Sequence, residues 1–308
     1  MGLACGEGGG DDGDGSGGSG GQNPFQPVTD LPAVTTLNAV WSFAPDDVWV
    51  AADGGRMLHY DGSTWTIEEL GATATMLDIW GFAPDDVWAV GGSSYARWDG
   101  SSWTVESFSD AAAGISSVVS TWASSPTDVW VGGDQSTAAH FDGTSWTRYI
   151  AAGTENEAIW GSGPDDVYVA GVFGIAHWDG SSWTELEDNE LFGAGAIWGS
   201  GPDDVWIADG SEFAHFDGSS WTYSEFDGLG GADALWGFGP DDVWGVGQFG
   251  SVLRNRGNGW LKVQSQSIGA PYLRSFVDVH GSGPDDIWVV GAQYGDDGIT
   301  PQLYHYEG

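Results

Sequence analysis

The sequence is poor in cysteine and in positive charge. Its 308 residues include one cysteine, Cys5, so no intramolecular disulfide can form. Seven Lys and Arg residues stand against 45 Asp and Glu residues, and the formal net charge is −38. Because nucleic acids and anionic membrane surfaces attract basic proteins, we expect neither as a partner. Such acidity is typical of a well-solvated protein outside the cytoplasm, or of one that meets cations.

The chain also lacks long hydrophobic runs and the common catalytic motifs. No apolar run approaches the ~20 residues of a membrane-spanning helix, so we predict no transmembrane segment. The sequence contains no glycine-rich phosphate loop, no nucleophile elbow and no zinc-binding spacing. We therefore expect no cofactor, and an enzymatic activity is uncertain and less favoured than binding.

Tryptophan and glycine, by contrast, are abundant, with 20 and 52 residues. All the tryptophans fall within a unit that recurs seven times at spacings of 38 to 44 residues. The unit opens with an apolar run around one aromatic residue, then a Pro-Asp-Asp turn (Pro-Thr-Asp in the third copy), then a second apolar run. An internal repeat of this length outweighs other sequence signals for the fold. The residues at the centre of the first run are Trp41, Trp80, Trp122, Trp160, Trp198, Trp236 and His280.

The second half of the unit is an aromatic-Asp-Gly turn that leads into Trp-Thr, as in 216–222. Each unit thus holds four short runs, A to D, separated by turn sequences. Trp, Val and Ile favour strands, and A runs such as 158–160 lack the alternation of a half-exposed strand. We predict an all-β fold, a seven-bladed β-propeller with four-stranded antiparallel blades.

Ring closure is predicted from the two ends of the chain. The seventh unit stops at 306–308, before its D run, and the segment 23–28 resembles a D run with Phe25 in the place of Trp. We therefore expect an N-terminal strand to complete blade seven, which leaves no open sheet edge. The propeller domain would span residues 23–308.

The repeat resembles those of known propeller families. The pattern Val-Trp-x-Val-Gly, as in 87–91, followed by aromatic-Asp-Gly-Ser-Ser-Trp, is similar to tectonin-type propellers and, more distantly, to Asp-box repeats. The resemblance covers residues 41–308. It implies recognition of glycans.

Residues 1–22 are predicted to be a disordered linker because Gly, Ser, Asp and Glu dominate them. The sequence Leu3-Ala4-Cys5-Gly6 before this linker resembles the cleavage site of bacterial lipoproteins. The resemblance implies lipid on Cys5 and a domain tethered to the cell envelope. The alternatives are myristoylation at Gly2 and an incidental cysteine in a disordered tail.

The two faces of the predicted propeller differ in how strictly they repeat. The A–B and C–D turns barely change between units, whereas the B–C and D–A connections on the other face change completely. Irregular loops on a rigid scaffold usually carry binding residues, so we expect the ligand on this variable face. Rings beside carboxylates suit sugars or cationic ligands, and packing between blades is the alternative role. The candidate ligand-binding residues are Tyr95, Phe173, Phe213, Phe249 and Tyr294 in B–C connections, and Tyr149 and Phe192 in D–A connections.

A second candidate site lies in the central channel, where the A strands of all blades converge. Asp78, Asp278 and His280 replace the alanine, serine or tryptophan found in other A runs. Together they could form a metal or acid–base site, and a solvated channel mouth is the simpler interpretation.

Two repeated polar features are interpreted as structural. The first is a histidine at one C-strand position of five blades, because residues spread around a ring cannot share one ion. The second is the Pro-Asp-Asp turn, whose carboxylates are expected to cap nearby N–H groups, with Ca²⁺ binding as the alternative. The histidines are His59, His140, His177, His215 and His305.

Taken together, the sequence predicts an exported, monomeric binding module at a bacterial cell envelope or cell surface. It would recognise a glycan or a protein ligand on the variable face. The alternatives are an enzyme with a metal-assisted channel site, of the lyase or lactonase kind, and a scaffold lipoprotein in envelope assembly.

The lipoprotein interpretation gives a direct prediction. In protein purified from its own cells, mass spectrometry should find an acylated Cys5 at the N-terminus, with residues 1–4 removed. A Cys5→Ser variant from the same cells should stay unmodified. An unmodified Cys5 thiol on a chain that still begins at Met1 would contradict the prediction.

Overall fold

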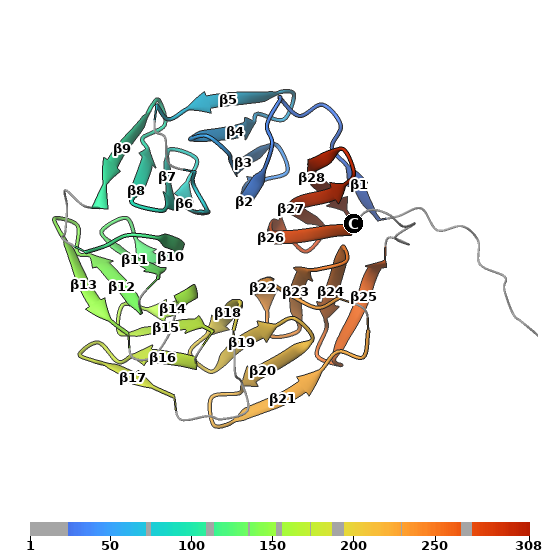
Figure 1. Cartoon of the computed structure of the whole chain (residues 1–308). Coiled ribbons are helices and arrows are strands. Elements are labelled where there is room, and N and C mark those ends of the chain that lie inside the picture. The colour runs from blue at the N-terminus through green and yellow to red at the C-terminus, as the bar shows by residue number, and fades with distance from the viewer. Residues whose placement is uncertain are drawn as a thin grey trace, which may run out of the picture.

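The computed structural model describes residues 24–71, 75–108, 114–134, 136–151, 156–172, 174–186, 194–228, 230–265 and 273–308. Cys5, the predicted linker, Phe173 and Phe192 lie outside these ranges. The described chain forms seven four-stranded antiparallel sheets arranged in a ring (Figure 1). The predicted seven-bladed propeller is therefore confirmed.

Each of the first six blades uses four consecutive strands, A to D, from the centre to the rim. Blades one to three are β2 (Leu37–Ala44), β3 (Asp47–Ala52), β4 (Arg56–Tyr60) and β5 (Trp65–Glu69); β6 (Asp78–Ala83), β7 (Asp86–Gly91), β8 (Ser94–Trp98) and β9 (Trp103–Ser107); and β10 (Val118–Ser125), β11 (Asp128–Gly133), β12 (Thr137–Phe141) and β13 (Trp146–Ile150). Blades four to six are β14 (Asn156–Gly163), β15 (Asp166–Gly171), β16 (Gly174–Trp178) and β17 (Trp183–Glu185); β18 (Ala196–Gly201), β19 (Asp204–Asp209), β20 (Glu212–Phe216) and β21 (Trp221–Glu225); and β22 (Ala234–Gly239), β23 (Asp242–Gly247), β24 (Ser251–Asn255) and β25 (Trp260–Ser265).

Blade seven joins the two ends of the chain. Its strands are β26 (Leu273–Gly283), β27 (Asp286–Gly295), β28 (Gly298–Glu307) and the N-terminal β1 (Phe25–Pro27). Phe25 pairs with Tyr306, as Trp65 pairs with Tyr60 in blade one, and it is only 1% exposed. Phe25 thus occupies the tryptophan position of a D strand, and closure by the N-terminal strand agrees with the prediction.

A clasp of three side chains repeats in every blade. The first residue of each B strand is an aspartate, whose carboxylate accepts a hydrogen bond from a histidine or arginine of the C strand. The imidazole or guanidinium also lies over the aromatic ring of the same B strand, as His59 does over Trp49 at 4.1 Å between ring centroids. The seven clasps are Asp47–His59–Trp49, Asp86–Arg97–Trp88, Asp128–His140–Trp130, Asp166–His177–Tyr168, Asp204–His215–Trp206, Asp242–Arg254–Trp244 and Asp286–His305–Trp288.

The clasp explains both repeated polar features. The histidines are structural, and the second aspartate of each Pro-Asp-Asp turn binds the C-strand cation or imidazole rather than acting only as a turn cap. In blade seven, burial opposes ionisation of Asp286, but hydrogen bonds from His305 and Ser282 hold the pKa of Asp286 below its ordinary value.

In the first five blades, one aspartate organises the C–D turn. In blade five, Asp217 Oδ1 accepts hydrogen bonds from the N–H and Oγ of Ser219 and from the Ser220 N–H, at 2.7–2.9 Å. The Ser219 hydroxyl and these N–H groups lower the pKa of Asp217 to about 2. Gly218 has a φ of 84°, which a side chain would strain.

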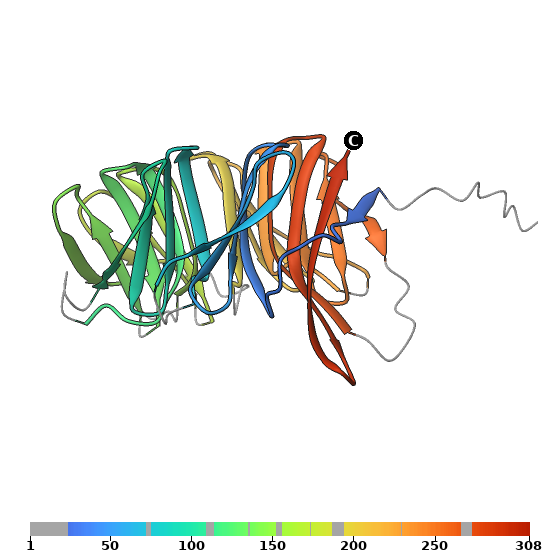
Figure 2. The ribbon, with the colours of Figure 1, turned by 90° about the horizontal axis from the view of Figure 1, so that it is seen from above.

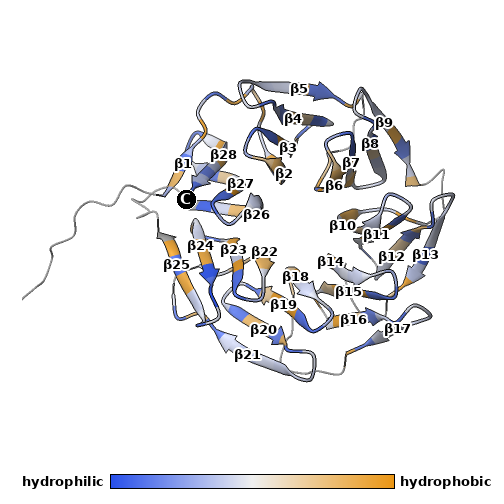
Figure 3. Cartoon of the chain, turned by 180° about the vertical axis from the view of Figure 1, so that it is seen from behind, coloured by the Kyte–Doolittle hydropathy of each residue, from blue (hydrophilic) through white to orange (hydrophobic). Residues whose placement is uncertain are grey.

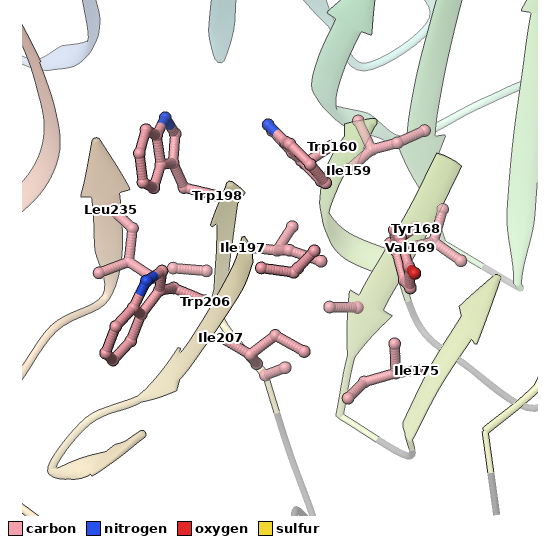
Figure 4. Close-up of a cluster of buried hydrophobic side chains, with 14 of the residues drawn as sticks. Ile159, Trp160, Tyr168, Val169, Ile175, Ile197, Trp198, Trp206, Ile207 and Leu235 are labelled. Atoms are coloured by element: carbon pink, nitrogen blue, oxygen red, sulfur yellow. The ribbon is translucent and has the colours of Figure 1, made fainter. Parts of the chain in front are cut away.

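The core of the molecule lies between the blades. Figure 4 shows part of this layer, where Ile197 and Ile207 of blade five and Leu235 of blade six belong to one buried cluster. The B strands are almost completely buried, whereas the D strands expose alternate residues. Figure 3 shows the resulting contrast between hydrophobic inner strands and mostly hydrophilic outer strands such as β5 and β21.

The position of Phe25 predicts the effect of N-terminal truncation. Removal of residues 1–30 deletes a buried ring that contacts Trp244 and Tyr306, with centroids 6.0 and 5.3 Å away. Loss of such a ring should lower the free energy of unfolding by ~3–5 kcal/mol, while removal of residues 1–20 should leave it unchanged. Urea unfolding of both truncations measures this, and equal midpoints would show that β1 does not stabilise the ring.

Candidate ligand-binding site

Blade seven differs from the other blades on the variable face. Its β27 has ten residues where the other B strands have six, so the hairpin of β27 and β28 projects beyond the ring (Figure 2). Tyr294 and Ile299 pair near the tip and are 43% and 53% exposed. Val277 of β26 is 42% exposed. These three are half of the six exposed large hydrophobic residues among the described ranges.

Three of the predicted ligand-binding aromatics pack between blades. Tyr95 is 8% exposed and stacks on Trp88, with a centroid distance of 5.7 Å. Phe213 is 1% exposed and lies 4.3 Å from Trp260 of blade six. Tyr149 is partly buried, against Trp130 and Trp178. Their ring faces are therefore covered by other rings.

The other two described candidates are Phe249, in the B–C connection of blade six, and Tyr294, near the end of β27 in blade seven. Phe249 is partly buried and has a φ of 57°, an uncommon conformation for a bulky residue. Tyr294 is the one of the five described candidates that is exposed. The predicted residues do not converge into one cluster.

The A strands enclose a central cavity of about 470 Å³. All seven blades contribute to its lining. The lining includes Asn38 of β2 and Val277 of β26, which precede the A-strand tryptophan or histidine and so lie on the side toward the variable face. The cavity has the volume of a typical small-ligand pocket.

The tryptophan rings of the A strands pack around this cavity, and each of several rings lies over the backbone of the next blade. In blades two, four, five and six, the glycine that follows the A-strand tryptophan is covered by the A-strand tryptophan of the preceding blade. A Cβ on Gly199 would lie 2.6 Å from Trp160, and one on Gly237 would lie 2.6 Å from Trp198. Glycine is therefore required at these positions by the close approach of a neighbouring ring.

This packing differs between blades seven and one, where the propeller closes. Blade seven has His280 in place of tryptophan, and blade one has Ser42 in place of glycine. His280 Nδ1 accepts a hydrogen bond from the Ser42 N–H at 3.0 Å, and the Ser42 hydroxyl donates to Asp286 at 3.1 Å. The smaller imidazole leaves room for the serine side chain, so the two departures compensate each other.

His280 is neutral at this position. Its ring lies between Trp41 and Trp236, with centroid distances of 4.0 and 3.9 Å. Burial lowers the pKa of His280 to about 3, against the opposing charge of Asp286. Because Nδ1 accepts from Ser42, the proton resides on Nε2, which has no hydrogen-bond partner within the described ranges.

Asp78 and Asp278 brace neighbouring blades at the cavity. Asp78 accepts the N–H of Thr121 in blade three at 2.7 Å, and Asp278 accepts the N–H of Val40 in blade one at 2.8 Å. The second oxygen of each carboxylate accepts the N–H of the following residue at 2.8 Å. Each acid therefore already has two backbone donors.

Burial raises the pKa of both carboxyls. The pKa of Asp78 rises to about 7 despite its N–H donors. The pKa of Asp278 rises well above its ordinary value because of burial and because of the nearby negative charge of Asp78. The cavity therefore contains a pair of acids that repel each other when both are ionised.

The structure brings Asp78, Asp278 and His280 to one cavity. Within the part of the chain that the structure describes, no three His, Cys, Asp or Glu side chains are arranged to hold a metal ion. The metal and acid–base interpretations stay predictions, and the observed contacts of these residues are with backbone N–H groups.

Sequence reasoning missed one acid of the cavity lining. Asp233 precedes β22, and burial together with the charge of Asp209 raises its pKa. The residue directly before an A strand varies between blades, so the repeat gave no signal for it.

The fold and the cavity define a seven-bladed propeller with a pocket of ligand size, and solved structures share this architecture. YCF48 bound to a D1 peptide has a TM-score of 0.70 and 16% identity, covering 93% of this chain and 97% of its own. The WD40 propeller domain of Doa1 has a TM-score of 0.72 and 11% identity, covering 91% and 96%. The extracellular domain of the putative hybrid two-component system BT3049 of B. thetaiotaomicron has a TM-score of 0.68 and 12% identity, covering 91% and 41%.

These similarities establish the fold. No protein-family model matches the sequence, and a search of curated proteins finds no similar sequence. Among the described residues, no helix is long and apolar enough to cross a membrane.

The raised pKa of Asp78 predicts a pH dependence of stability. Between about pH 4 and about pH 7 the unfolded carboxyl loses its proton while the folded one keeps it, so stability falls as the pH rises. Asp78→Asn should reduce this fall between about pH 5 and about pH 8 by on the order of 1–2 kcal/mol, allowing for cavity water.

Urea unfolding of both proteins at the two pH values measures the difference. Both proteins contain the same histidines, so the contribution of histidine titration to the pH dependence cancels when the variant is compared with the wild type. The asparagine keeps only one of the two N–H bonds, so the pH dependence, and not the absolute stability, is the relevant quantity. An unchanged pH dependence would show that Asp78 titrates normally.

Proposed function

We propose that this propeller is an exported binding module that recognises a segment of a protein partner on its variable face. The observation that carries the proposal is the projecting hairpin of blade seven, beside the mouth of the central cavity. Exposed Tyr294, Ile299 and Val277 offer apolar contacts there, and interfaces are enriched in such residues. The net charge of −38 favours a basic partner.

A protein ligand is favoured over a glycan because most loop aromatics pack between blades. Sugar recognition usually needs exposed ring faces, and Tyr95, Phe213 and Tyr149 have theirs covered. A propeller of the same fold binds a peptide, which agrees with this choice without locating the site. A glycan remains the alternative that the tectonin resemblance implies.

The proposed location is the bacterial cell envelope or surface, with Cys5 as a lipid anchor. The acidic composition supports export, and two similar folds are extracellular domains of B. thetaiotaomicron proteins. A scaffold role in envelope assembly would use the same binding face. The channel-enzyme alternative gains no support from the carboxylates, because backbone N–H groups already occupy them.

The test is a selection of displayed random peptides against the wild-type protein, followed by calorimetric titration. Tyr294→Ser with Ile299→Ser should weaken the selected peptides by about tenfold or more, because buried aromatic and aliphatic contacts dominate such interfaces. Leu261→Ser, at an exposed residue of the β25 rim strand, is the matched control and should leave affinity unchanged. Equal losses in both variants, or binders only on a glycan array, would refute the proposed ligand.

A further inference from the structure

The junction between blades five and six contains a cleft of about 670 Å³ at the rim of the propeller. Its aromatic wall consists of Trp206, Phe226 and Trp260. Trp206 is 7% exposed, and its partners in the cleft are only partly buried. The cleft is separate from the central cavity, which the A strands line.

One ring of the repeat is missing at this cleft, which is larger than a counterpart of about 550 Å³ between blades two and three, where the ring of Phe141 is present. At other junctions, an aromatic residue at the end of the next C strand packs on the B-strand ring. Trp98 lies 5.2 Å from Trp49, Phe141 lies 5.6 Å from Trp88, and Tyr306 lies 5.6 Å from Trp244.

Blade six has Asn255 at this position, so Trp206 contacts only one ring of that blade, the D-strand ring of Trp260 at 5.6 Å, in addition to His215 of its own blade at 4.0 Å. Asn255 is 3% exposed, and its Oδ1 accepts the N–H of Gly257 at 2.9 Å. The asparagine thus stabilises its own turn and does not fill the space of the ring. In blade two, Trp98 also donates to the Pro84 carbonyl, and the counterpart Pro240 borders the cleft.

The edges of the cleft are negatively charged. Glu225, Asp227 and Asp241 border it and are exposed. None of the described residues that line it is a lysine or an arginine. Aromatic faces beside carboxylates attract cations, through the ring quadrupole and through charge pairing.

The protein itself shows which cation fits such a setting. The Arg254 guanidinium lies 4.3 Å from the Trp244 ring centroid and binds both oxygens of Asp242, at 2.6 and 2.8 Å. Arg97 makes the same contacts with Trp88 and Asp86. A guanidinium is planar, so it can stack where an aromatic ring would lie.

We propose that the cleft between blades five and six binds an arginine side chain of a protein partner. The guanidinium occupies the place of the missing ring, stacked against the aromatic wall and paired with the carboxylates at the edge. This inference rests on the proposed function only in taking the partner to be a protein.

The probe is the peptide acetyl-Gly-Gly-Arg-Gly-Gly-amide, compared with its citrulline analogue, which has the same shape without the charge. Tryptophan indole signals are followed by ¹⁵N NMR, with Trp206 and Trp260 assigned from Trp→Phe variants. We expect saturable shifts of these two signals with the arginine peptide, and binding of the citrulline peptide weaker by about tenfold.

The decisive variant restores the repeat. Asn255→Phe with Arg256→Asp recreates the Phe-Asp-Gly turn of blade five and fills the cleft, so it should abolish the shifts while the melting temperature is kept or raised. Arg256→Asp alone is the matched control, which leaves the cleft open and should bind the arginine peptide at least as well as wild type.

A second variant tests the proposal independently if the Asn255→Phe, Arg256→Asp protein folds poorly. Glu225→Gln with Asp227→Asn changes only exposed carboxylates and should weaken the arginine peptide severalfold without affecting the citrulline peptide. Equal binding of both peptides, unchanged binding after filling, tighter binding of a phenylalanine peptide, or no shifts at millimolar peptide would overturn the proposal. The Tyr294 and Ile299 variant should bind the arginine peptide normally, so failure on blade seven and failure at the cleft are distinguishable.

Discussion

Neighbouring blades meet where the B-strand ring of one blade packs against aromatic rings of the next, and the rest of the propeller depends on this contact. The ring of Trp49, for example, is covered by His59 of its own blade on one side and contacts Trp98 and Trp103 of blade two. The imidazole is held in turn by Asp47. Because neighbouring blades meet through this layer, aromatic rings recur in the B, C and D strands of successive units, and they include 14 of the twenty tryptophans.

The departures from the repeat divide into compensated and uncompensated ones. His280 in place of tryptophan is matched by Ser42 in place of glycine, and Phe25 takes the place of a D-strand tryptophan with the same register. Arg254 in place of histidine keeps both the ion pair and the ring contact. Asn255, in contrast, stands where other blades have an aromatic ring, and it lines a cleft that is larger than its counterpart between blades two and three. An uncompensated loss of packing is a reason to look for a ligand, since consistent packing is what a repeat scaffold otherwise maintains.

The sequence predicted the architecture well because the repeat encodes it. Blade number, strand order and the role of Phe25 all follow from the spacing of Trp and of the two turn sequences. The direction of the loop rings was beyond prediction. Tyr95 and Phe213 were predicted in B–C connections but lie in the C strands β8 and β20, and the register of these strands, which the repeat does not reveal, turns them between blades. The sequence shows that the turn at 255–257 departs from the aromatic-Asp-Gly pattern. The cleft could not be predicted from it, because the cleft depends on how far apart blades five and six lie. Likewise, Asp78 and Asp278 were identifiable as exceptions, but their bonds to the N–H groups of neighbouring blades are tertiary contacts.

The two channel acids indicate which side of the cavity is specialised. Their position is alanine in blades one, four, five and six, so assembly of the ring does not require a carboxylate there. Both acids have raised pKa values, which means that the folded protein disfavours their ionisation. Asp278 and Asp78 lie on blades seven and two, on either side of blade one, and blade seven also carries the projecting hairpin with Tyr294 and Ile299. The two acids and the exposed apolar surface therefore lie on the same side of the ring, and a cationic group of a protein segment bound at this side of the cavity would favour ionisation of the acids.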